Sequence, residues 1–347
     1  MYQNRHTHID RPVAKLRVIA SFLPETILSN DELAEFYPGW TAQKIEAKTG
    51  ITERHIAAPG ETAADLAYAA ATRLFQHHNI DPAQIDMLLL CTQTPDHVIP
   101  TTACALHHRL GLRRTSGAID IGLACSGFVY GLALAKGLIE SGLAASILLV
   151  TADTYSKLIH PLDRSVRTLF GDGAAATLIE AVEAEVPAIG PFVFGTDGAG
   201  TDKLLVPAGA MRRPACAASA IMAADPSGNV RSADNLFMDG AAIMAFSLAE
   251  VPKAVALLTE ASGIALADMD AVVFHQASAL LLEALRKKLG IPREKFILAM
   301  ARSGNTVSST IPIALEHLMA TRATTASAML VGFGAGYSWA ATNVTLN

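Results

Sequence analysis

Residues 117–137 read Gly-Ala-Ile-Asp-Ile-Gly-Leu-Ala-Cys-Ser-Gly-Phe-Val-Tyr-Gly-Leu-Ala-Leu-Ala-Lys-Gly, and this stretch decides the fold. Its first part, 118–121, is apolar at alternate positions and predicts a strand. Its second part, from Ser126 onward, is rich in Ala, Leu and Gly, which favours a closely packed, buried helix. Cys125 lies at the junction, where helix N–H groups and the helix dipole would both stabilise a reactive thiolate. For this residue taken alone, a small buried core cysteine is the competing interpretation.

The composition indicates a large folded core. Of the 347 residues, 51% are hydrophobic and 17% are charged, which argues against disorder. The net charge is −5 and the Lys and Arg residues are scattered, so we expect no nucleic-acid partner. The four cysteines have no CxxC spacing, so we expect no metal site and no disulfide framework, and a reducing cytoplasm fits best.

One segment approaches the length of a membrane span. Residues 119–139 are largely apolar, but Asp120, Lys136 and four glycines interrupt them. We therefore expect a buried helix and no membrane partner.

Strand-like and helix-like segments alternate along the chain, which predicts an α/β fold. Residues 195–231 have no steady period and are rich in Gly, Pro, Asp and Ala, so we expect a surface excursion that could serve as a lid. The strands are expected at 16–23, 85–91, 118–121, 145–152, 174–181, 270–275, 295–300 and 328–333. The helices are expected after Ser29, at 62–79, 101–110, from 126, and at 240–262, 280–289 and 307–320.

The chain also contains an internal repeat. Residues 79–90 resemble residues 263–274, and residues 144–150 resemble residues 325–331 at a similar separation. We therefore predict two pseudo-duplicated halves, 1–190 and 191–347. This alignment matches the Cys125 junction with the Ser303-Gly304-Asn305 junction and places His275 at a strand end. Cys125, His275 and Asn305 can then meet at the carboxyl ends of strands, where α/β sheets usually place chemistry.

A Cys, a His and an Asn suit acyl transfer. The thiolate attacks a thioester and holds the acyl group. A neutral imidazole and an amide can then donate hydrogen bonds to an oxygen that becomes negative. The turn Gly332-Phe333-Gly334-Ala335-Gly336 either supplies backbone N–H groups to an oxyanion hole or is a turn that needs positive φ. It lacks the spacing and the Lys of a phosphate-binding loop.

These residues resemble the thiolase-fold condensing enzymes, and specifically the β-ketoacyl-(acyl carrier protein) synthase III family. The resemblance covers the chain from about Leu16 to its C-terminus. The matching motifs are Lys48-Thr-Gly-Ile-Thr-Glu-Arg-His-Ile, Ala124-Cys-Ser-Gly-Phe-Val-Tyr, Phe170-Gly-Asp-Gly-Ala, His275-Gln-Ala-Ser, Ser303-Gly-Asn-Thr-Val-Ser-Ser-Thr-Ile-Pro and Gly332-Phe-Gly-Ala-Gly-Tyr-Ser-Trp.

The resemblance implies a cytoplasmic homodimer of five-layered α-β-α-β-α subunits, with coenzyme A thioesters as substrates and no cofactor. It implies that Cys125 is acylated from an acyl-CoA or an acyl carrier protein. His275 and Asn305 would promote decarboxylation of a malonyl thioester on acyl carrier protein or coenzyme A. The product would be a β-ketoacyl thioester for fatty acid or related polyketide biosynthesis.

The resemblance also implies the roles of residues around this centre. The backbone N–H groups of Cys125 and Ala335 would hold the thioester oxyanion. The substrate pocket would include Ile99, Phe170, Phe333 and Ser278, and coenzyme A would meet Lys48 and Arg164.

The chain departs from the family at several positions. Lys44 stands where the family has a Trp that helps hold the adenine of coenzyme A, and the nearest Trp is Trp40. Ser278 replaces an Asn, and Leu280 replaces an Arg that docks acyl carrier protein. Ile99 matches a position that often reaches the partner subunit's acyl pocket. Because an aliphatic side chain leaves more room there than Phe, we expect an acyl primer longer than acetyl.

Two alternatives stay open. The Ser278 and Leu280 departures motivate an acyltransferase of the same fold that passes the acyl group to a non-malonyl acceptor. A non-catalytic acyl-binding partner subunit is the other alternative, although such a protein has no need of an activated thiolate.

Overall fold

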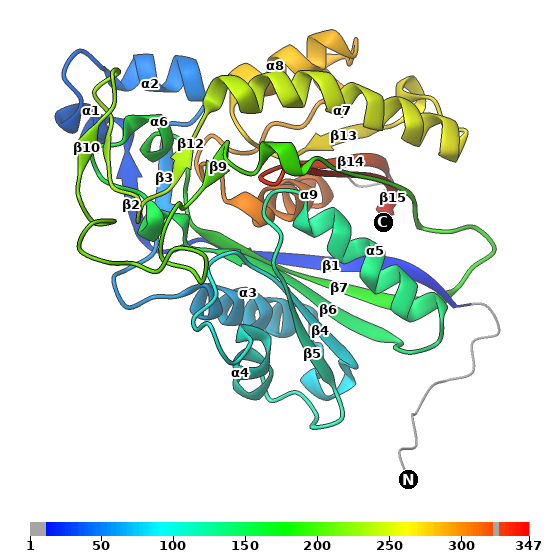
Figure 1. Ribbon diagram of the computed structural model, residues 1–347. Coiled ribbons are helices and arrows are strands. Elements are labelled where there is room, and N and C mark those ends of the chain that lie inside the picture. Colours follow the sequence, from blue (N-terminus) through cyan, green and yellow to red (C-terminus); the bar gives the residue numbers. More distant parts are fainter. Residues whose placement is uncertain (1–11, 322–325, 347) are drawn as a thin grey trace.

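Two large β-sheets and three layers of helices form the body of the described part of the chain, residues 12–321 and 326–346 of a computed structural model (Figure 1). The strand order of the first sheet is β1-β7-β6-β4-β5, and that of the second is β13-β14-β15-β8. The first sheet consists of β1 (Pro12–Phe22), β4 (Met87–Cys91), β5 (Gly117–Ile121), β6 (Ser146–Asp153) and β7 (Gly173–Glu183). The second consists of β8 (Ile189–Thr196), β13 (Ala271–Phe274), β14 (Ala326–Gly334) and β15 (Ser338–Leu346).

The helices form the outer layers and the central layer. Helices α5 (Gly127–Glu140) and α9 (Thr310–Thr321) lie between the sheets and contact both of them. Helices α3 (Ala63–His78) and α4 (Thr102–Arg109) cover the first sheet, and α7 (Gly240–Ser262) and α8 (Ala279–Lys288) cover the second (Figure 1). This confirms the predicted five-layered α-β-α-β-α architecture.

The central layer explains the composition of the opening stretch. Phe128, Leu132 and Ile139 of α5 are fully buried, and Gly131 has Leu149 of β6 so close that a Cβ would lie 2.6 Å from it. A helix buried between two sheets has apolar residues on more than one face and small residues where a sheet approaches. The Ala, Leu and Gly content of 126–137 therefore follows from the position of α5.

Matching aspartates show the duplication directly. The N–H of Asp86 donates to the carbonyl of Ser146 at 2.9 Å, and the N–H of Asp270 donates to that of Ser327 at 3.1 Å. The side-chain carboxylates of the same two residues accept hydrogen bonds in turn: Asp86 from the Ser146 N–H and Asp270 from the Ser327 N–H. In both halves these pairs begin two parallel strands, β4 with β6 and β13 with β14.

One predicted strand is wrong. Residues 295–300 form no strand, and only a single bridge joins Phe296 to Val272. The side chain of Gln276 takes the backbone groups that strand pairing would use. Its Nε2 donates to the carbonyls of Phe274 and Ile297, and its Oε1 accepts from the Ala299 N–H. The second sheet consequently has no counterpart of β5 at this edge.

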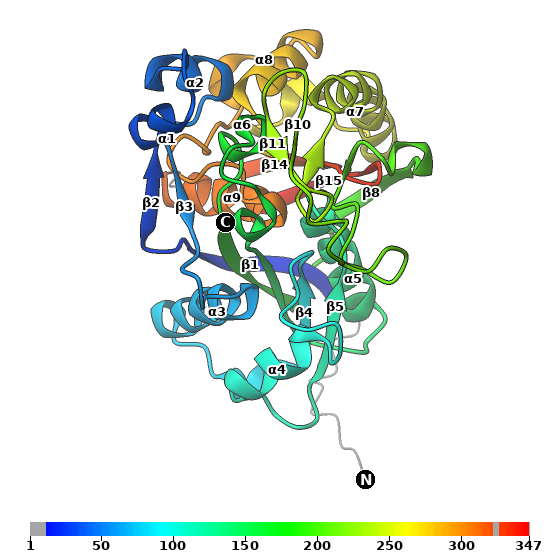
Figure 2. The ribbon, with the colours of Figure 1, turned by 60° about the vertical axis from the view of Figure 1, so that its left-hand side comes forward.

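The excursion between β8 and α7 is held against the body of the protein (Figure 2). Its short strand β9 (Leu204–Leu205) pairs with β12 (Phe237–Met238), and β10 (Ala223–Ala224) pairs with β11 (Val230–Arg231). Arg231 forms ion pairs with the buried Asp163 at 2.8 Å and with Asp225 at 2.7 Å. The ion pair with Asp163 links the excursion to the body of the protein.

The remaining elements are short strands and helices that connect the elements described above. They are β2 (Thr26–Ser29), α1 (Asn30–Phe36), α2 (Ala42–Thr49), β3 (Glu53–Ile56) and α6 (Arg164–Arg167), and the short helices η1 (Pro82–Gln84), η2 (Tyr155–Leu158), η3 (Gly198–Gly200), η4 (Leu266–Asp268), η5 (Arg293–Lys295) and η6 (Val307–Ser309). The halfway boundary expected at residues 190/191 falls inside β8.

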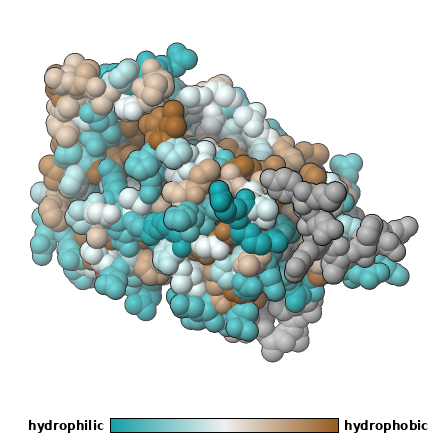
Figure 3. Space-filling view, turned by 90° about the horizontal axis from the view of Figure 1, so that it is seen from below, coloured by the Kyte–Doolittle hydropathy of each residue, from teal (hydrophilic) through white to brown (hydrophobic). Residues whose placement is uncertain are grey.

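Helix α7 is the one helix of the described residues that is long and apolar enough to cross a membrane by length and composition. In this structure its buried residues, among them Val251, Val255 and Leu258, pack on β8, β14, β15 and α8. The face in Figure 3 carries hydrophobic residues interspersed among hydrophilic ones.

Candidate active site

Cys125 lies where the sequence predicts it, between the end of β5 and the start of α5, and is 4% exposed. Strand β14 runs directly beside it. A Cβ on Gly334 would lie 2.8 Å from the Cys125 Cβ and 3.0 Å from its Sγ, and a Cβ on Gly332 would lie 2.8 Å from the Cys125 carbonyl oxygen. Neither glycine has positive φ. Gly332 and Gly334 are therefore required by the approach of the cysteine, whereas Gly336 of the same turn has a φ of 137°.

His275 follows β13 and extends its pairing, because its N–H donates to the carbonyl of Val331 at 2.8 Å. Its ring is buried, and Nδ1 lies 2.8 Å from the hydroxyl of Thr310 at the start of α9. This hydrogen bond leaves Nε2 as the ring nitrogen that can meet a substrate.

Asn305 is fixed by its backbone and its side chain. Its N–H donates to the carbonyl of Leu169, and its carbonyl accepts from the N–H of Gly171. Its side-chain Oδ1 accepts from the Val307 N–H at 2.9 Å. The Nδ2 group of Asn305 is thus the part of the amide that remains for a substrate.

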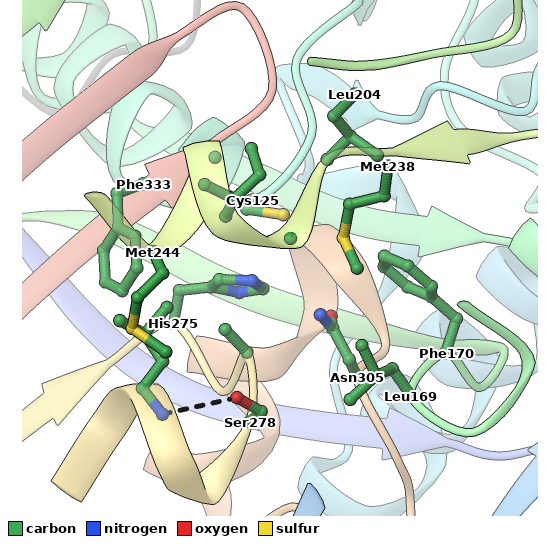
Figure 4. A pocket seen from close by; sticks show the side chains of 15 residues that line it. Cys125, Leu169, Phe170, Leu204, Met238, Met244, His275, Ser278, Asn305 and Phe333 are labelled. Carbon is green, nitrogen blue, oxygen red and sulfur yellow. Dashed lines mark hydrogen bonds between the residues drawn. The ribbon is translucent and has the colours of Figure 1, made fainter. Parts of the chain in front are cut away.

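The three side chains share one cavity of about 130 Å³ (Figure 4). Figure 4 shows the Cys125 sulfur, the His275 ring and the Asn305 amide pointing into the same space. Cys125 comes from the first half of the chain, and the other two come from the second half. The other side chains that line the cavity are those of Leu169, Phe170, Leu204, Met238, Ile243, Met244, Ala277, Ser278, Leu281 and Phe333.

Burial keeps both reactive groups neutral. It lowers the pKa of His275 from 6.5 to about 3, so the ring is an uncharged imidazole at ordinary pH. It raises the pKa of Cys125 well above its usual value, and the carboxylate of Asp153 adds to this effect. The backbone N–H of Cys125 lowers the pKa of its thiol by less than burial raises it. Burial therefore opposes the thiolate that the helix N-terminus was expected to favour.

A second cavity, of about 750 Å³, adjoins the first across Leu204, which lines both. Ala335 lines this larger cavity, and in the described part of the chain nothing accepts a hydrogen bond from its N–H. The wall is mostly apolar, but Tyr155 donates its hydroxyl proton to Oε1 of Gln93 there. Leu205, Val206 and Leu236 of the excursion complete it.

The residues expected to meet coenzyme A gather around Trp40. The Lys48 ammonium lies 4.9 Å from the Trp40 ring centroid, that of Lys44 lies 5.0 Å away, and the Arg164 guanidinium lies 5.4 Å away. Trp40 lies four residues before Lys44. An aromatic ring is consequently present beside Arg164 even though Lys44 replaces the expected Trp.

Three of the four residues predicted for the substrate pocket line the cavity that Cys125, His275 and Asn305 share, and Ile99 does not. Phe170, Phe333 and Ser278 line the catalytic cavity, and the Ser278 hydroxyl also caps α8 through the Leu281 N–H (Figure 4). Ile99 is 85% exposed and lines neither cavity of this single chain.

Sequence reasoning missed several residues of the site. Leu204 and Met238 come from the excursion, where no periodicity marked them. Tyr155 lies two residues after the last residue of the apolar strand β6, and this position could have been used to predict it. Val307 and Thr310 lay inside the motif that follows Asn305.

No group of three His, Cys, Asp or Glu side chains that could hold a metal ion occurs in residues 12–321 and 326–346.

Two family models match the sequence. The model of 3-oxoacyl-[acyl-carrier-protein (ACP)] synthase III matches residues 119–198, and the model of its C-terminal part matches residues 259–346. The chain is 36% identical over 331 residues to β-ketoacyl-[acyl-carrier-protein] synthase III 3 of Streptomyces coelicolor, covering 94% of this chain and 95% of that relative. It is 34% identical over 322 residues to β-ketoacyl-[acyl-carrier-protein] synthase III of Caldanaerobacter subterraneus, covering 92% and 94%.

Solved structures agree with these matches. A crystal structure of a 3-oxoacyl-(acyl-carrier-protein) synthase III superposes with a TM-score of 0.95 at 56% identity, covering 96% of this chain and 100% of that one. The priming β-ketosynthase of a polyketide biosynthetic pathway superposes with a TM-score of 0.83 at 32% identity, covering 97% of each chain.

Proposed function

The chain belongs to the 3-oxoacyl-[acyl-carrier-protein] synthase III family, and on this premise we propose that it condenses an acyl group held on Cys125 with a decarboxylated malonyl thioester. One observation carries the proposal. Cys125, His275 and Asn305 line a single buried cavity, although they come from different halves of the chain.

In the first step Cys125 takes the acyl group. Its sulfur forms a bond to the thioester carbon, the bond to the coenzyme A sulfur breaks, and the thiol proton leaves with coenzyme A as its S–H. The oxygen of the tetrahedral intermediate needs donors, and the backbone N–H groups of Cys125 and Ala335 are the proposed pair.

In the second step a malonyl thioester loses CO₂. The thioester oxygen becomes enolate-like, and the Nε2–H of His275 and the Nδ2–H of Asn305 are the proposed donors to it. The resulting carbanion attacks the acyl carbon, and Cys125 leaves as a thiolate that then takes up a proton. Since the ring of His275 is neutral, it serves as a hydrogen-bond donor without adding a charge to the cavity.

The larger cavity is the proposed site of the acyl chain. Its volume of about 750 Å³ lies in the range of pockets that hold whole small molecules. This volume is far larger than that of an acetyl group. This space is the support for our proposal that the primer is longer than acetyl. We expect a homodimer in the cytoplasm, in which the exposed Val98 and Ile99 of one subunit reach the acyl pocket of the other.

Trp40 and Arg164 are the proposed clamp for the adenine of coenzyme A. The Arg164 guanidinium lies over the Trp40 ring, 5.4 Å from its centroid, and Lys44 and Lys48 place positive charge beside the ring for the phosphates.

The test follows the mass of Cys125 and the release of ¹⁴CO₂. The purified protein is treated with acyl-CoAs of two to twelve carbons and then with malonyl thioesters on coenzyme A or acyl carrier protein. We expect an adduct that Cys125→Ala abolishes, and that persists in Cys104→Ser and Cys216→Ser, which remove the two exposed cysteines. His275→Ala should keep the adduct and slow CO₂ release. Labelling by acetyl-CoA alone would contradict the longer primer.

A second candidate keeps the acylation step and changes the acceptor. It rests on Leu280, which is exposed in the first turn of α8 where the family has an Arg that docks acyl carrier protein. An adduct on Cys125 with no CO₂ release from any malonyl thioester would favour this acyltransferase. Absence of any adduct would favour a non-catalytic acyl-binding subunit.

A further inference from the structure

Val307 has an unusual backbone beside the catalytic cavity. Its φ is 55°, a left-handed value that β-branched residues rarely adopt, and its side chain is fully buried. Strain of this kind persists where the surroundings impose it and is common at functional sites. The two polar groups of this residue reach the two partners of Cys125: its N–H donates to Asn305 Oδ1, and its carbonyl oxygen lies 3.1 Å from the Thr310 hydroxyl that contacts His275.

The Thr310 hydroxyl lies between His275 and this carbonyl. Its oxygen is 2.8 Å from His275 Nδ1 and 3.1 Å from the Val307 carbonyl oxygen. A hydroxyl has one proton to donate. The proton is therefore offered to two acceptors, the ring nitrogen at the shorter distance and the carbonyl at the longer one.

The choice between these acceptors determines the tautomer of His275. The neutral imidazole carries one proton. If the hydroxyl donates to Nδ1, the ring proton must be on Nε2, which then faces the cavity as a donor. If the hydroxyl donates to Val307, Nδ1 must itself donate to the hydroxyl, and Nε2 is left bare. The decarboxylation step needs Nε2–H, because a thioester oxygen accepts hydrogen bonds and cannot donate them.

We propose that Thr310 is the positioning residue that donates to Nδ1 of His275 and thereby keeps the ring proton on Nε2. This inference rests on the proposed function for its catalytic consequence, but the tautomer itself can be observed without any reaction.

Removing the hydroxyl should reverse the tautomer. Without it, the acceptor that these contacts leave on the far side of the lost hydroxyl from Nδ1 is the Val307 carbonyl, which can only accept. The ring would then protonate Nδ1 and present a bare Nε2 to the cavity. A wrong histidine tautomer costs roughly 10⁴-fold in the Ser-His-Asp enzymes, where proton transfer depends on it. Here the ring only donates a hydrogen bond, so we expect a loss of about 10²-fold in CO₂ release.

The experiment compares three variants with the wild type. Thr310→Val is nearly isosteric and lacks the hydroxyl, Thr310→Ser keeps the hydroxyl, and Thr321→Val makes the same change at the other end of α9, where the hydroxyl only bonds to carbonyls of its own helix. Each protein is labelled with ¹⁵N-histidine, and the ring nitrogens of His275 are assigned by their absence from His275→Ala. Acylation of Cys125 and ¹⁴CO₂ release are measured on the same samples.

We expect Nε2 to be protonated in the wild type, in Thr310→Ser and in Thr321→Val, and Nδ1 to be protonated in Thr310→Val. CO₂ release should fall about 100-fold in Thr310→Val alone, with the Cys125 adduct forming at a rate within about three-fold of the wild type. A wild type protonated on Nδ1, or a Thr310→Val protein that keeps Nε2–H, overturns the inference. So does full CO₂ release from Thr310→Val. A wild type with Nε2–H that forms no adduct refutes the proposed function and leaves the tautomer assignment standing.

Discussion

Gly334→Ala tests whether the glycine turn exists to admit Cys125. The added Cβ would lie 2.8 Å from the Cys125 Cβ and 3.0 Å from its Sγ. Carbon atoms in contact normally lie about 3.5–4.0 Å apart, so one of the two residues must move by about 0.7–1.2 Å. Overpacking of this kind costs typically about 1–3 kcal/mol of unfolding free energy. A shift of about 1 Å in a reacting group can cost about 10²-fold in rate.

The assay separates these two effects. Acylation of Cys125 by a saturating acyl-CoA is followed by mass, and stability is measured by urea unfolding. We expect acylation to slow by about 10²-fold in Gly334→Ala, with a loss of about 1–3 kcal/mol in stability. Gly137→Ala is the matched control, because Gly137 lies in α5 with no atom within 4 Å of its added Cβ and without positive φ. That change should keep acylation and raise stability by about 0.4–1 kcal/mol.

The reasoning fails if Gly334→Ala acylates within two-fold of the wild-type rate while remaining folded. Such a result would mean that β14 moves away from Cys125 without cost, and that Gly334 has another explanation than contact with the sulfur.

Three further predictions use the same structure. Trp40→Ala should raise the KM for acyl-CoA by roughly 5- to 150-fold, since base–aromatic stacking contributes about 1–3 kcal/mol. Acylation by an acyl-pantetheine thioester, which has no adenine, should be unchanged. Equal effects on both acyl donors would exclude adenine stacking. Because burial raises the pKa of Cys125, its alkylation rate in a Cys104→Ser, Cys216→Ser background should still be rising at pH 9, whereas a plateau near pH 7 would indicate a thiolate at rest. Burial also raises the pKa of Asp153 from 3.8 to about 7, so the folded state holds this proton more tightly than the unfolded state and stability should fall as pH rises from about 4 to 7. Asp153→Asn should flatten that decline in urea unfolding, and an unchanged slope would contradict the assignment.

The repeat makes much of the fold predictable from the sequence. Asp86 and Asp270 begin equivalent strand pairs, and their similar spacing to Ser146 and Ser327 is enough to predict two matching sheets. The same repeat fails at 295–300, because apolar periodicity does not register that the Gln276 side chain can occupy the backbone groups of a neighbouring segment. A local pattern predicts which residues can form a strand. Here the Gln276 side chain, about twenty residues away in the sequence, bonds to the backbone of 297–299 in place of a neighbouring strand.

The site divides in a similar way. Cys125, His275 and Asn305 could be found because the repeat and their motifs place them at matching junctions, although no strand directly precedes Asn305 in the described part of the chain. The protonation state of Cys125 could not, because a helix N-terminus is visible in a sequence and the degree of burial is not. Trp40 could not be assigned either: it lies four residues before the expected position, ahead of α2, and only the fold shows that it still meets Arg164.

Burial explains why Cys125 and His275 are both uncharged before the reaction. Charges left unpaired in a dry cavity are costly, so the resting site holds a thiol and a neutral imidazole. Negative charge arises only on the substrate oxygen during reaction, and hydrogen-bond donors in a water-poor cavity act on it more strongly than in water. Neutrality has a consequence for the second half of the chain, because a neutral imidazole donates from one nitrogen only. A cationic ring would donate from both nitrogens and would need no Thr310 to choose between them. The hydroxyl at the start of α9 is thus required by the same burial that keeps Cys125 protonated.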